Sequence, residues 1–203
     1  MKNSSALLAR TFLALGLTAL VSASARAAEP TAFDLIKEAD RYVGEQAKDK
    51  IVQIRSDKSV GTLTPNIWYV VFYDNTATLK ATEVKLGAGK MLSVHRPMRL
   101  LEPVTGGDVP MDRDKLKVDS DQAIKTATAE PLLQNLKLTA TQLKLERVAE
   151  GALGGGMAQP VWKVRLWAAK LRNQYRDADI GEIWVSAIDD KVLKTDLHLN
   201  RVD

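Results

Sequence analysis

The stretch that decides the predicted fold lies near the end of the chain and reads IGEIWVSAIDDKVLKTDLHLNRV, residues 180–202. Apolar residues recur at every second position on both sides of residues 189–191, which is typical of two half-buried strands joined by a turn. We therefore predict a β-hairpin with one buried face. In its second strand the residues expected on the buried side are Leu193, Thr195, Leu197 and Leu199, with Lys194, Asp196 and His198 on the other side.

A weaker version of this hairpin pattern occurs at residues 81–96, and the elements before it also occur twice. In each half, a predicted helix is followed by a short strand, a long strand and a hairpin. Matching positions are Ile36 with Ile124, Ile54 with Leu145, Trp68 with Trp162, and Leu92 with Leu193. Chance agreement of a few apolar positions is the alternative. We predict an α+β fold of two repeated units, each one helix packed on a small antiparallel β-sheet.

The expected organisation has four parts in a chain of 203 residues. A leader covers residues 1–27, a first unit residues 28–96, and a second unit residues 118–203. Residues 97–117 between the units contain three prolines and two glycines, which break regular structure, so they are interpreted as a linker. Trp68 and Trp162 are the expected buried anchors of the two units.

The first residues follow the pattern of a secretory signal. Lys2 and Arg10 give a positive start, an apolar run covers residues 11–21, and small residues surround Arg26, so we predict cleavage after Ala27. The rival interpretation is a membrane anchor, but the segment between the two arginines is shorter than the roughly 20 residues that span a bilayer. We therefore expect the mature protein in the periplasm or outside the cell, without stable insertion in a membrane.

The charge balance changes when the leader is set aside. Residues 1–27 carry three of the 29 basic residues and no acid, which leaves 26 basic and 25 acidic residues and a net charge of +1. This balance gives no evidence for a nucleic acid or an anionic membrane as a partner. The absence of cysteine excludes disulfides, a thiol nucleophile and a cysteine-linked lipid anchor.

Several segments of the second half resemble a known family. They are SDQAIKTA at 120–127, WKV at 162–164, IWV at 183–185 and IDDKVL at 188–193, and they are similar to the PepSY domain. The resemblance covers residues 118–199 and extends faintly to 32–95. It departs from the family at Asp190, where a glycine is usual, whereas Gly89 keeps that glycine in the first half. A long loop at 150–160 is a second departure.

The resemblance carries expectations about function. PepSY domains are small modules of helix and sheet in secreted and membrane-associated bacterial proteins, and they also occur in propeptides of secreted metallopeptidases. The resemblance implies inhibition, chaperoning or ligand holding near the cell envelope, and it supplies no catalytic residue.

A search for chemistry finds no strong motif. His95 and His198 stand alone, so neither a nucleophile with its base nor a zinc site is indicated. The glycine-rich segment 151–156 precedes a predicted strand instead of a helix, which favours a loop over a phosphate cradle. Four aspartates are interpreted as helix caps or solvated residues instead of calcium ligands: Asp112, Asp114, Asp119 and Asp121. A catalytic pair of carboxylates that are distant in the sequence and close in the fold stays an open alternative.

The candidate binding site is the loop at residues 170–180. Arg172, Tyr175 and Arg176 lie at the predicted hairpin tip, and tyrosine and arginine are frequent anchors of protein interfaces. Trp167 lies at its base on the polar face of its strand. Together they form a candidate docking patch for a peptide or a carboxylate-bearing ligand. The alternative is an ordinary charged loop with Trp167 covered by the other unit.

Three functions follow from these observations, in order of preference. The first is a non-catalytic protein that binds another envelope protein, as an inhibitor or chaperone of a peptidase. The second is a carrier of a small ligand or lipid that uses the curved sheet or a cleft between the units. The third is an enzyme with an unrecognised pair of carboxylates. No cofactor or metal is expected, and no nucleic acid partner.

Overall fold

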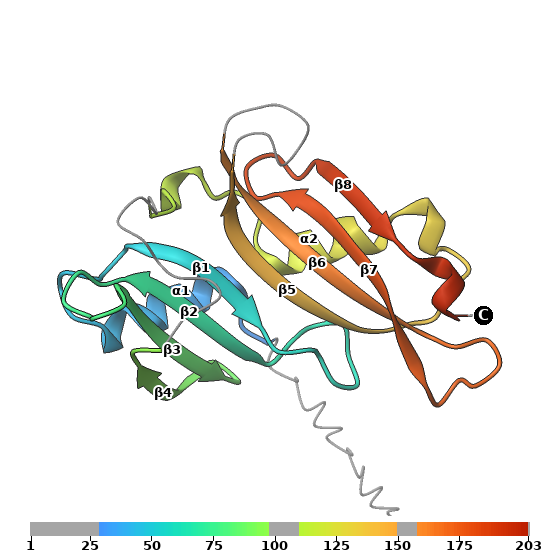
Figure 1. Cartoon of the computed structure of the whole chain (residues 1–203), viewed down its shortest axis with the longest axis horizontal. Helices are drawn as coiled ribbons and strands as arrows, with labels where there is room; N and C mark the ends of the chain where they lie inside the picture. Colours follow the sequence, from blue (N-terminus) through green and yellow to red (C-terminus); the bar gives the residue numbers. More distant parts are fainter. Residues whose placement is uncertain (1–28, 98–109, 150–157, 203) are drawn as a thin grey trace, which may run out of the picture.

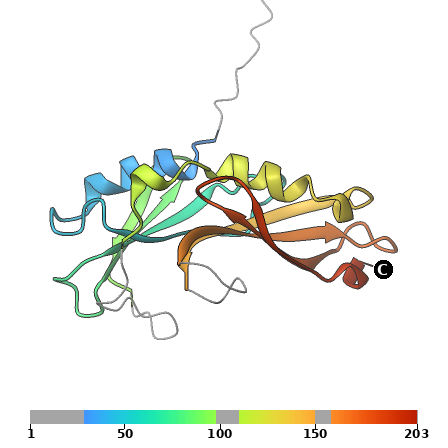
Figure 2. The same ribbon diagram turned by 90° about the horizontal axis from the view of Figure 1, so that it is seen from above.

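Eight strands form one antiparallel sheet in the order β4-β3-β2-β1-β5-β6-β7-β8, and two helices cover one of its faces (Figures 1 and 2). The computed structural model describes residues 29–97, 110–149 and 158–202. The helices are α1 (Ala32–Ala39) and α2 (Ser120–Thr128). The strands are β1 (Ile51–Ser56), β2 (Ile67–Tyr73), β3 (Ala81–Gly87), β4 (Lys90–His95), β5 (Leu138–Val148), β6 (Gln159–Ala169), β7 (Asp177–Ser186) and β8 (Val192–Leu197). Short 3-10 turns are η1 (Asp40–Tyr42), η2 (Arg113–Lys115), η3 (Pro131–Leu133) and η4 (Leu199–Val202).

The predicted fold class is wrong, because the chain does not form two units with a small sheet each. Strands β1 and β5 pair directly, with Ile54 opposite Leu145, and this pairing makes one sheet of all eight strands. One hydrophobic core then runs under both helices. In two separate sheets, β1 and β5 would each be an edge with unpaired backbone groups, and their pairing satisfies those groups. Alternation along a strand does not reveal which strand lies beside it.

The starts of the two helices are linked. The carboxylate of Asp119 accepts a hydrogen bond from Ser120 N at the start of α2 and another from Phe33 N in α1, at 2.6 and 3.1 Å. The Ser120 hydroxyl accepts a hydrogen bond from Ala32 N at 3.0 Å. The first backbone N–H groups of a helix have no partner within the helix. Residues of one helix therefore cap the other, which ties the two halves together on the covered face.

The predicted hairpin at the end of the chain is confirmed, with one local difference. Strand β7 pairs with β8, and Gly181 lies opposite Leu197. A register shift next to Trp184 turns Leu193 toward the face without helices, where it packs on Trp184. The prediction that Leu193 shares the buried side with Leu197 is therefore wrong, because a bulge interrupts the alternation.

The two predicted anchors are buried. Trp68 and Trp162 lie in the core under the helices, and each indole N–H donates to a backbone carbonyl, of Pro65 and Val118 respectively, at 3.0 and 2.8 Å. A buried indole needs a partner for its N–H group. Trp68 and Trp162 are therefore both buried and hydrogen-bonded, as expected for structural anchors.

Parts of the predicted organisation lie outside the described residues, namely the leader at 1–27, the glycine-rich segment at 151–156 and most of the predicted linker. Its last residues are described, and Met111 N donates to Ile51 O at 2.8 Å while Lys117 N donates to Ala187 O at 2.9 Å. This end of the segment therefore binds both halves of the sheet. Within the described ranges, no helix has the length and apolar character needed to span a bilayer.

Candidate functional site

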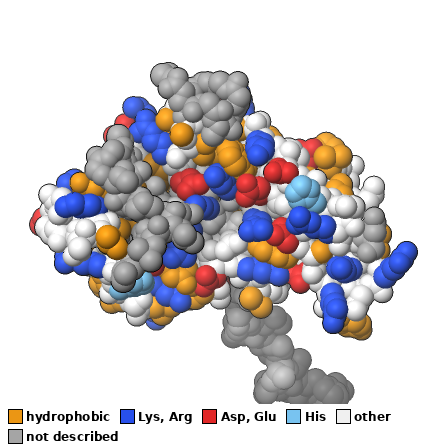
Figure 3. Space-filling model, viewed as in Figure 1, with side chains coloured by type: hydrophobic (Ala, Val, Ile, Leu, Met, Phe, Trp, Pro, Cys, Tyr) orange, Lys and Arg blue, Asp and Glu red, His pale blue; other side chains and the backbone are white. Residues whose placement is uncertain are grey.

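The face of the sheet opposite the helices carries most of the charged and aromatic side chains of the strands, and we call it the helix-free face. Successive side chains of a strand point to opposite faces, so the polar positions of each strand gather on this face. In β6, Trp162, Val164 and Leu166 are buried on the covered face, whereas Lys163 and Arg165 point to the helix-free face. Figure 3 shows Lys and Arg side chains interspersed with Asp and Glu across the middle of this face.

One row of directly opposite residues crosses seven strands of the helix-free face. We call it the cation–aromatic row, and in spatial order from β3 to β8 it contains Lys85, Tyr69, Arg55, Lys144, Lys163, Trp184 and Lys194. Opposite residues on neighbouring antiparallel strands have Cβ atoms about 4.5–5.5 Å apart. Five cations and two aromatic rings are therefore held in one line by the register of the sheet.

The aromatic rings of the row lie between cations. The guanidinium of Arg55 is 3.9 Å from the centre of the Tyr69 ring, and Lys85 Nζ is 5.1 Å from it. The ring of Trp184 is flanked in the same way by Lys163 Nζ at 4.3 Å and Lys194 Nζ at 4.8 Å. Such contacts attract the cations electrostatically to the rings. They fix the positions of long side chains that would otherwise be mobile.

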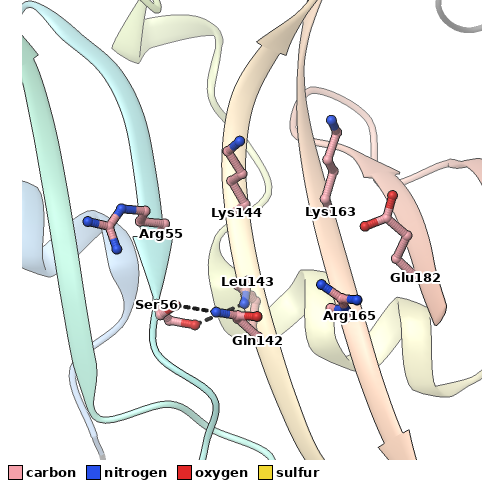
Figure 4. Close-up of a pocket in the computed structure, with 8 residues that line it drawn as sticks. All are labelled: Arg55, Ser56, Gln142, Leu143, Lys144, Lys163, Arg165 and Glu182. Carbon is pink, nitrogen blue, oxygen red and sulfur yellow. Dashed lines mark hydrogen bonds between the residues drawn. The ribbon is translucent and has the colours of Figure 1, made fainter. Parts of the chain in front are cut away.

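The centre of the row has three cations in succession, Arg55, Lys144 and Lys163, on β1, β5 and β6. They surround a hollow of about 200 Å3 (Figure 4). Like charges directly opposite one another in a sheet are destabilising. The hollow is lined by Arg55, Ser56, Gln142, Leu143, Lys144, Lys163, Arg165 and Glu182.

Acids in the neighbouring row hold these cations. Glu83 accepts from Arg55 at 2.9 Å, and Glu146 lies 2.8 Å from Lys144 and 2.7 Å from Lys163. The Glu83 side chain is only 4% exposed, whereas that of Arg55 is 36% exposed. Arg55 therefore lies outside Glu83, whereas Glu146 is 20% exposed and lies nearly level with Lys144 and Lys163.

The charge of Glu146 is maintained by its partners. Burial alone would raise the pKa of Glu146, but hydrogen bonds from Lys144 and Lys163 outweigh burial and hold this pKa below its ordinary value of 4.5. The carboxylate is therefore ionised at neutral pH. The guanidinium of Arg55 has five donors, so its contact with Glu83 leaves donors that a bound anion can use.

The predicted site residue Trp167 lies on the helix-free face, half-buried. Lys58 Nζ, from the segment after β1, is 4.7 Å from its ring centre, and Arg165 is 5.8 Å from it. Lys58 also pairs with Asp177 at 2.5 Å. The first half of the chain therefore contributes a side chain that covers this tryptophan.

The other predicted site residues lie at the end of the β6–β7 hairpin. Arg172 and Tyr175 line a shallow hollow together with Lys137, and Tyr175 is fully exposed. Arg176 is exposed beside them, and its backbone N–H donates to Asn173 O at 2.9 Å. The structure brings these three residues together at the tip, and Trp167 is not among the residues that line the hollow there.

The remaining candidates are surface or capping residues. His95 Nε2 is 3.1 Å from Glu83, and His198 Nε2 is 3.6 Å from Asp196, with about half of each imidazole side chain exposed. Asp112 caps η2, as Asp119 caps α2. Within the described part of the chain, no three His, Cys, Asp or Glu residues are grouped so that they could hold a metal ion.

The chain matches no protein-family model, and searches of curated proteins and of solved structures find no match either. The resemblance to PepSY domains therefore stays a prediction. Sequence reasoning missed the central residues of the row, because Arg55, Lys144 and Lys163 come from strands that only the β1–β5 pairing brings together. The alternation along β6 shows which of its own residues share a face, but not that Lys144 and Trp184 lie on either side of Lys163.

Proposed function

We propose that the protein is a non-catalytic binding module that recognises an acidic surface of a partner protein through the cation–aromatic row. The observation that carries this proposal is the succession of Arg55, Lys144 and Lys163 directly opposite one another. Cations directly opposite one another repel, and the contacts with Glu83 and Glu146 offset part of this repulsion. A partner that supplies further carboxylates relieves the remaining repulsion on binding.

The length of the row favours a protein over a small molecule. From Lys85 to Lys194 it crosses six strand-to-strand intervals of about 4.8 Å each, or roughly 29 Å. Specific protein interfaces bury about 800 Å2 on each partner and are enriched in tyrosine, tryptophan and arginine. A row of this length fits that description with Tyr69 and Arg55 partly exposed, while Trp184, 8% exposed, supports Lys163 and Lys194 from beneath.

The carrier function has less support. It expected a curved sheet or a cleft between two units, whereas β1 and β5 pair within one sheet, and the hollow at that junction is lined by residues of both halves. The central hollow of about 200 Å3 is smaller than the roughly 300–1,000 Å3 of typical ligand pockets, and four cations line it. Surface recognition therefore fits the geometry better.

The leader and the PepSY resemblance suggest where the partner is found. We place the mature protein in the periplasm or outside the cell, and an envelope peptidase is one partner that the resemblance suggests. Both statements are part of the proposal and follow from residues 1–27 and from the segments at 120–127 and 188–193.

Site-specific photo-cross-linking in cells that naturally make the protein tests the proposal. A photoreactive residue replaces Lys194, at one end of the row, or Lys125, which is exposed on α2. We expect a discrete protein adduct from position 194 and none from position 125. The adduct should weaken at high salt, which screens interactions between exposed charges.

A second variant tests whether the row itself is responsible. Lys163→Glu in the position-194 background should abolish the adduct, because it places an acid at the centre of the row. Equal adducts from positions 194 and 125, an adduct that persists with Lys163→Glu, or no adduct from position 194 would each contradict the proposal.

A further inference from the structure

The end of the β6–β7 hairpin and the segment before β5 carry a group of exposed or partly exposed cations. We call it the tip cluster, and it contains Lys137, Lys170, Leu171, Arg172, Tyr175 and Arg176. In the described ranges, no acidic side chain forms an ion pair with any of its four cations. Figure 3 shows Lys and Arg side chains projecting where this hairpin ends. The cations of the row differ, because Arg55, Lys144 and Lys163 pair with acids.

Apolar side chains lie among these cations and face solvent. Tyr175 is fully exposed and Leu171 is 64% exposed. In helices that lie at a membrane interface, apolar side chains enter the bilayer and neighbouring Lys and Arg contact the headgroups. The tip presents the same two kinds of side chain on a hairpin. Tyrosine in particular is enriched there, because its ring is apolar and its hydroxyl is polar.

The tip is a preformed structure. Lys170 N donates to Arg176 O at 2.9 Å and closes the hairpin, and Leu171 N donates to Val202 O at 2.8 Å, which fixes the hairpin to η4. Ala169 N donates to Lys137 O at 2.9 Å and places Lys137 beside the hairpin. Because these contacts exist before binding, little conformational entropy is lost when the tip meets a surface.

We propose that the tip cluster docks the protein on the surface of a bilayer that contains anionic lipids. The hairpin projects beyond the sheet, so its end can meet a flat surface without obstruction from the helices (Figures 1 and 2). The four cations contact lipid headgroups, and Leu171 and Tyr175 enter the interface. This docking is peripheral and does not require a membrane-spanning segment. The net charge of the chain did not indicate this docking, because the four cations of the tip cluster are concentrated in one place and acids elsewhere balance them.

Two features of the tip cluster favour an anionic bilayer over an acidic protein as its partner. The tip projects beyond the sheet with Leu171 and Tyr175 exposed to solvent, whereas protein recognition sites of high affinity bury their anchors in pockets. Its apolar residues are separated by polar ones along the hairpin, with Arg172, Asn173 and Gln174 between Leu171 and Tyr175. That spacing suits shallow insertion of two side chains at separate points of a plane.

Vesicle co-sedimentation tests the proposal. The protein is the processed form that begins at Ala28, which contains every described helix and strand. Vesicles of phosphatidylcholine alone are compared with vesicles of phosphatidylcholine and phosphatidylglycerol. We expect binding to the anionic vesicles only, and weaker binding as salt is raised. Each basic residue near an anionic surface contributes about fivefold to the partition coefficient.

Matched variants locate the binding surface. Arg172→Glu with Arg176→Glu should lower the partition coefficient at least about 25-fold. The control, Lys37→Glu with Lys125→Glu, makes the same change in net charge on the helices and should retain binding. Leu171→Ser with Tyr175→Ser keeps the charge and should weaken binding at every salt concentration. All substituted side chains are exposed, so circular dichroism should show an unchanged fold.

Three results would overturn the proposal. They are no binding of the unchanged protein to anionic vesicles, binding of the arginine variant equal to that of the unchanged protein, and equal loss in the helix control. Cross-linking from the row tests a separate surface, so failure here leaves the proposed protein partner untouched, and the reverse is also true.

Discussion

The two faces of the sheet are built by the same strands and differ in almost every property. On the covered face, Trp162 and Leu145 belong to one apolar core that both helices share. On the helix-free face, Lys163 and Lys144 occupy the alternate positions of the same strands and form a charged row with aromatic rings. The alternating pattern of each strand therefore specifies the core directly, but it specifies the charged row only once the strands are paired. The covered face depends on which residues are apolar, and the helix-free face depends on which residues become neighbours.

The largest expected effect is on the covered face. Trp162→Ala should lower the free energy of unfolding by about 3–5 kcal/mol, because it leaves a cavity in the core and removes the hydrogen bond to Val118 O. Urea denaturation measures the change. Trp167→Ala on the helix-free face is the matched control and should cost about 1 kcal/mol, since that ring is half-buried and held mainly by cations. Equal costs for the two tryptophans would remove the energetic distinction between the faces.

A second effect concerns the hairpin turn that contacts the covered face. Asp190 has a positive φ of 63°, and its carboxylate accepts hydrogen bonds of 2.7 Å from Gln122 and from Thr126 in α2. Asp190→Ala keeps the strained backbone and loses both bonds, so it should cost about 2 kcal/mol. Asp190→Gly loses the same bonds but removes the strain, so it should cost about 1 kcal/mol less. The same denaturation experiment compares them, and identical costs would show that the turn is not strained.

A third effect is the dependence of stability on acid. The pKa of Glu146 is lower in the folded protein than in the unfolded chain, so the unfolded chain binds a proton first as pH falls. The stabilisation by Glu146 is therefore complete above its ordinary pKa of 4.5, decreases below it, and is lost when pH falls through the folded pKa. Glu146→Gln should show a shallower loss of stability in that range. A slope equal to that of the unchanged protein would mean that Glu146 does not hold the central lysines.

The smallest change in the free energy of unfolding is expected for Lys163→Gln, which should nevertheless weaken partner binding strongly. Lys163→Gln removes one cation of the central three and its contact with Glu146, and it should change the free energy of unfolding by less than about 1 kcal/mol. Capture of the partner by cross-linking from position 194 should nevertheless decrease strongly. If stability decreased as much as in Trp162→Ala, the row would be a structural feature of the sheet and not a recognition surface.

The sequence was informative where the physical signal is local. Alternating apolar residues predicted the β7–β8 hairpin, and the aromatic positions Trp68 and Trp162 were correctly expected in the core. The sequence was misleading where the outcome depends on contacts between distant strands. It suggested two sheets because each half contains four strands, and nothing in β1 or β5 alone shows that Ile54 lies beside Leu145.

The same limit applies to the candidate sites. Arg172, Tyr175 and Arg176 were found from residue types because they are close in sequence, and they remain together at the tip. The row was not found, because it requires the register of seven strands and a pairing between the two halves. Bulges add a further limit, as the displaced Leu193 shows.

Recognition through the cation–aromatic row is tested most directly by acetylation footprinting of lysines by mass spectrometry, with and without an envelope extract from cells that naturally make the protein. The molecule contains its own control, because Lys163 and Lys194 lie on the helix-free face and Lys37 and Lys125 lie on the helices. If the cation–aromatic row is the recognition surface, the extract protects Lys163 and Lys194 and leaves Lys37 and Lys125 unchanged. Protection of the helix lysines alone, or no protection of Lys163 and Lys194, would contradict it.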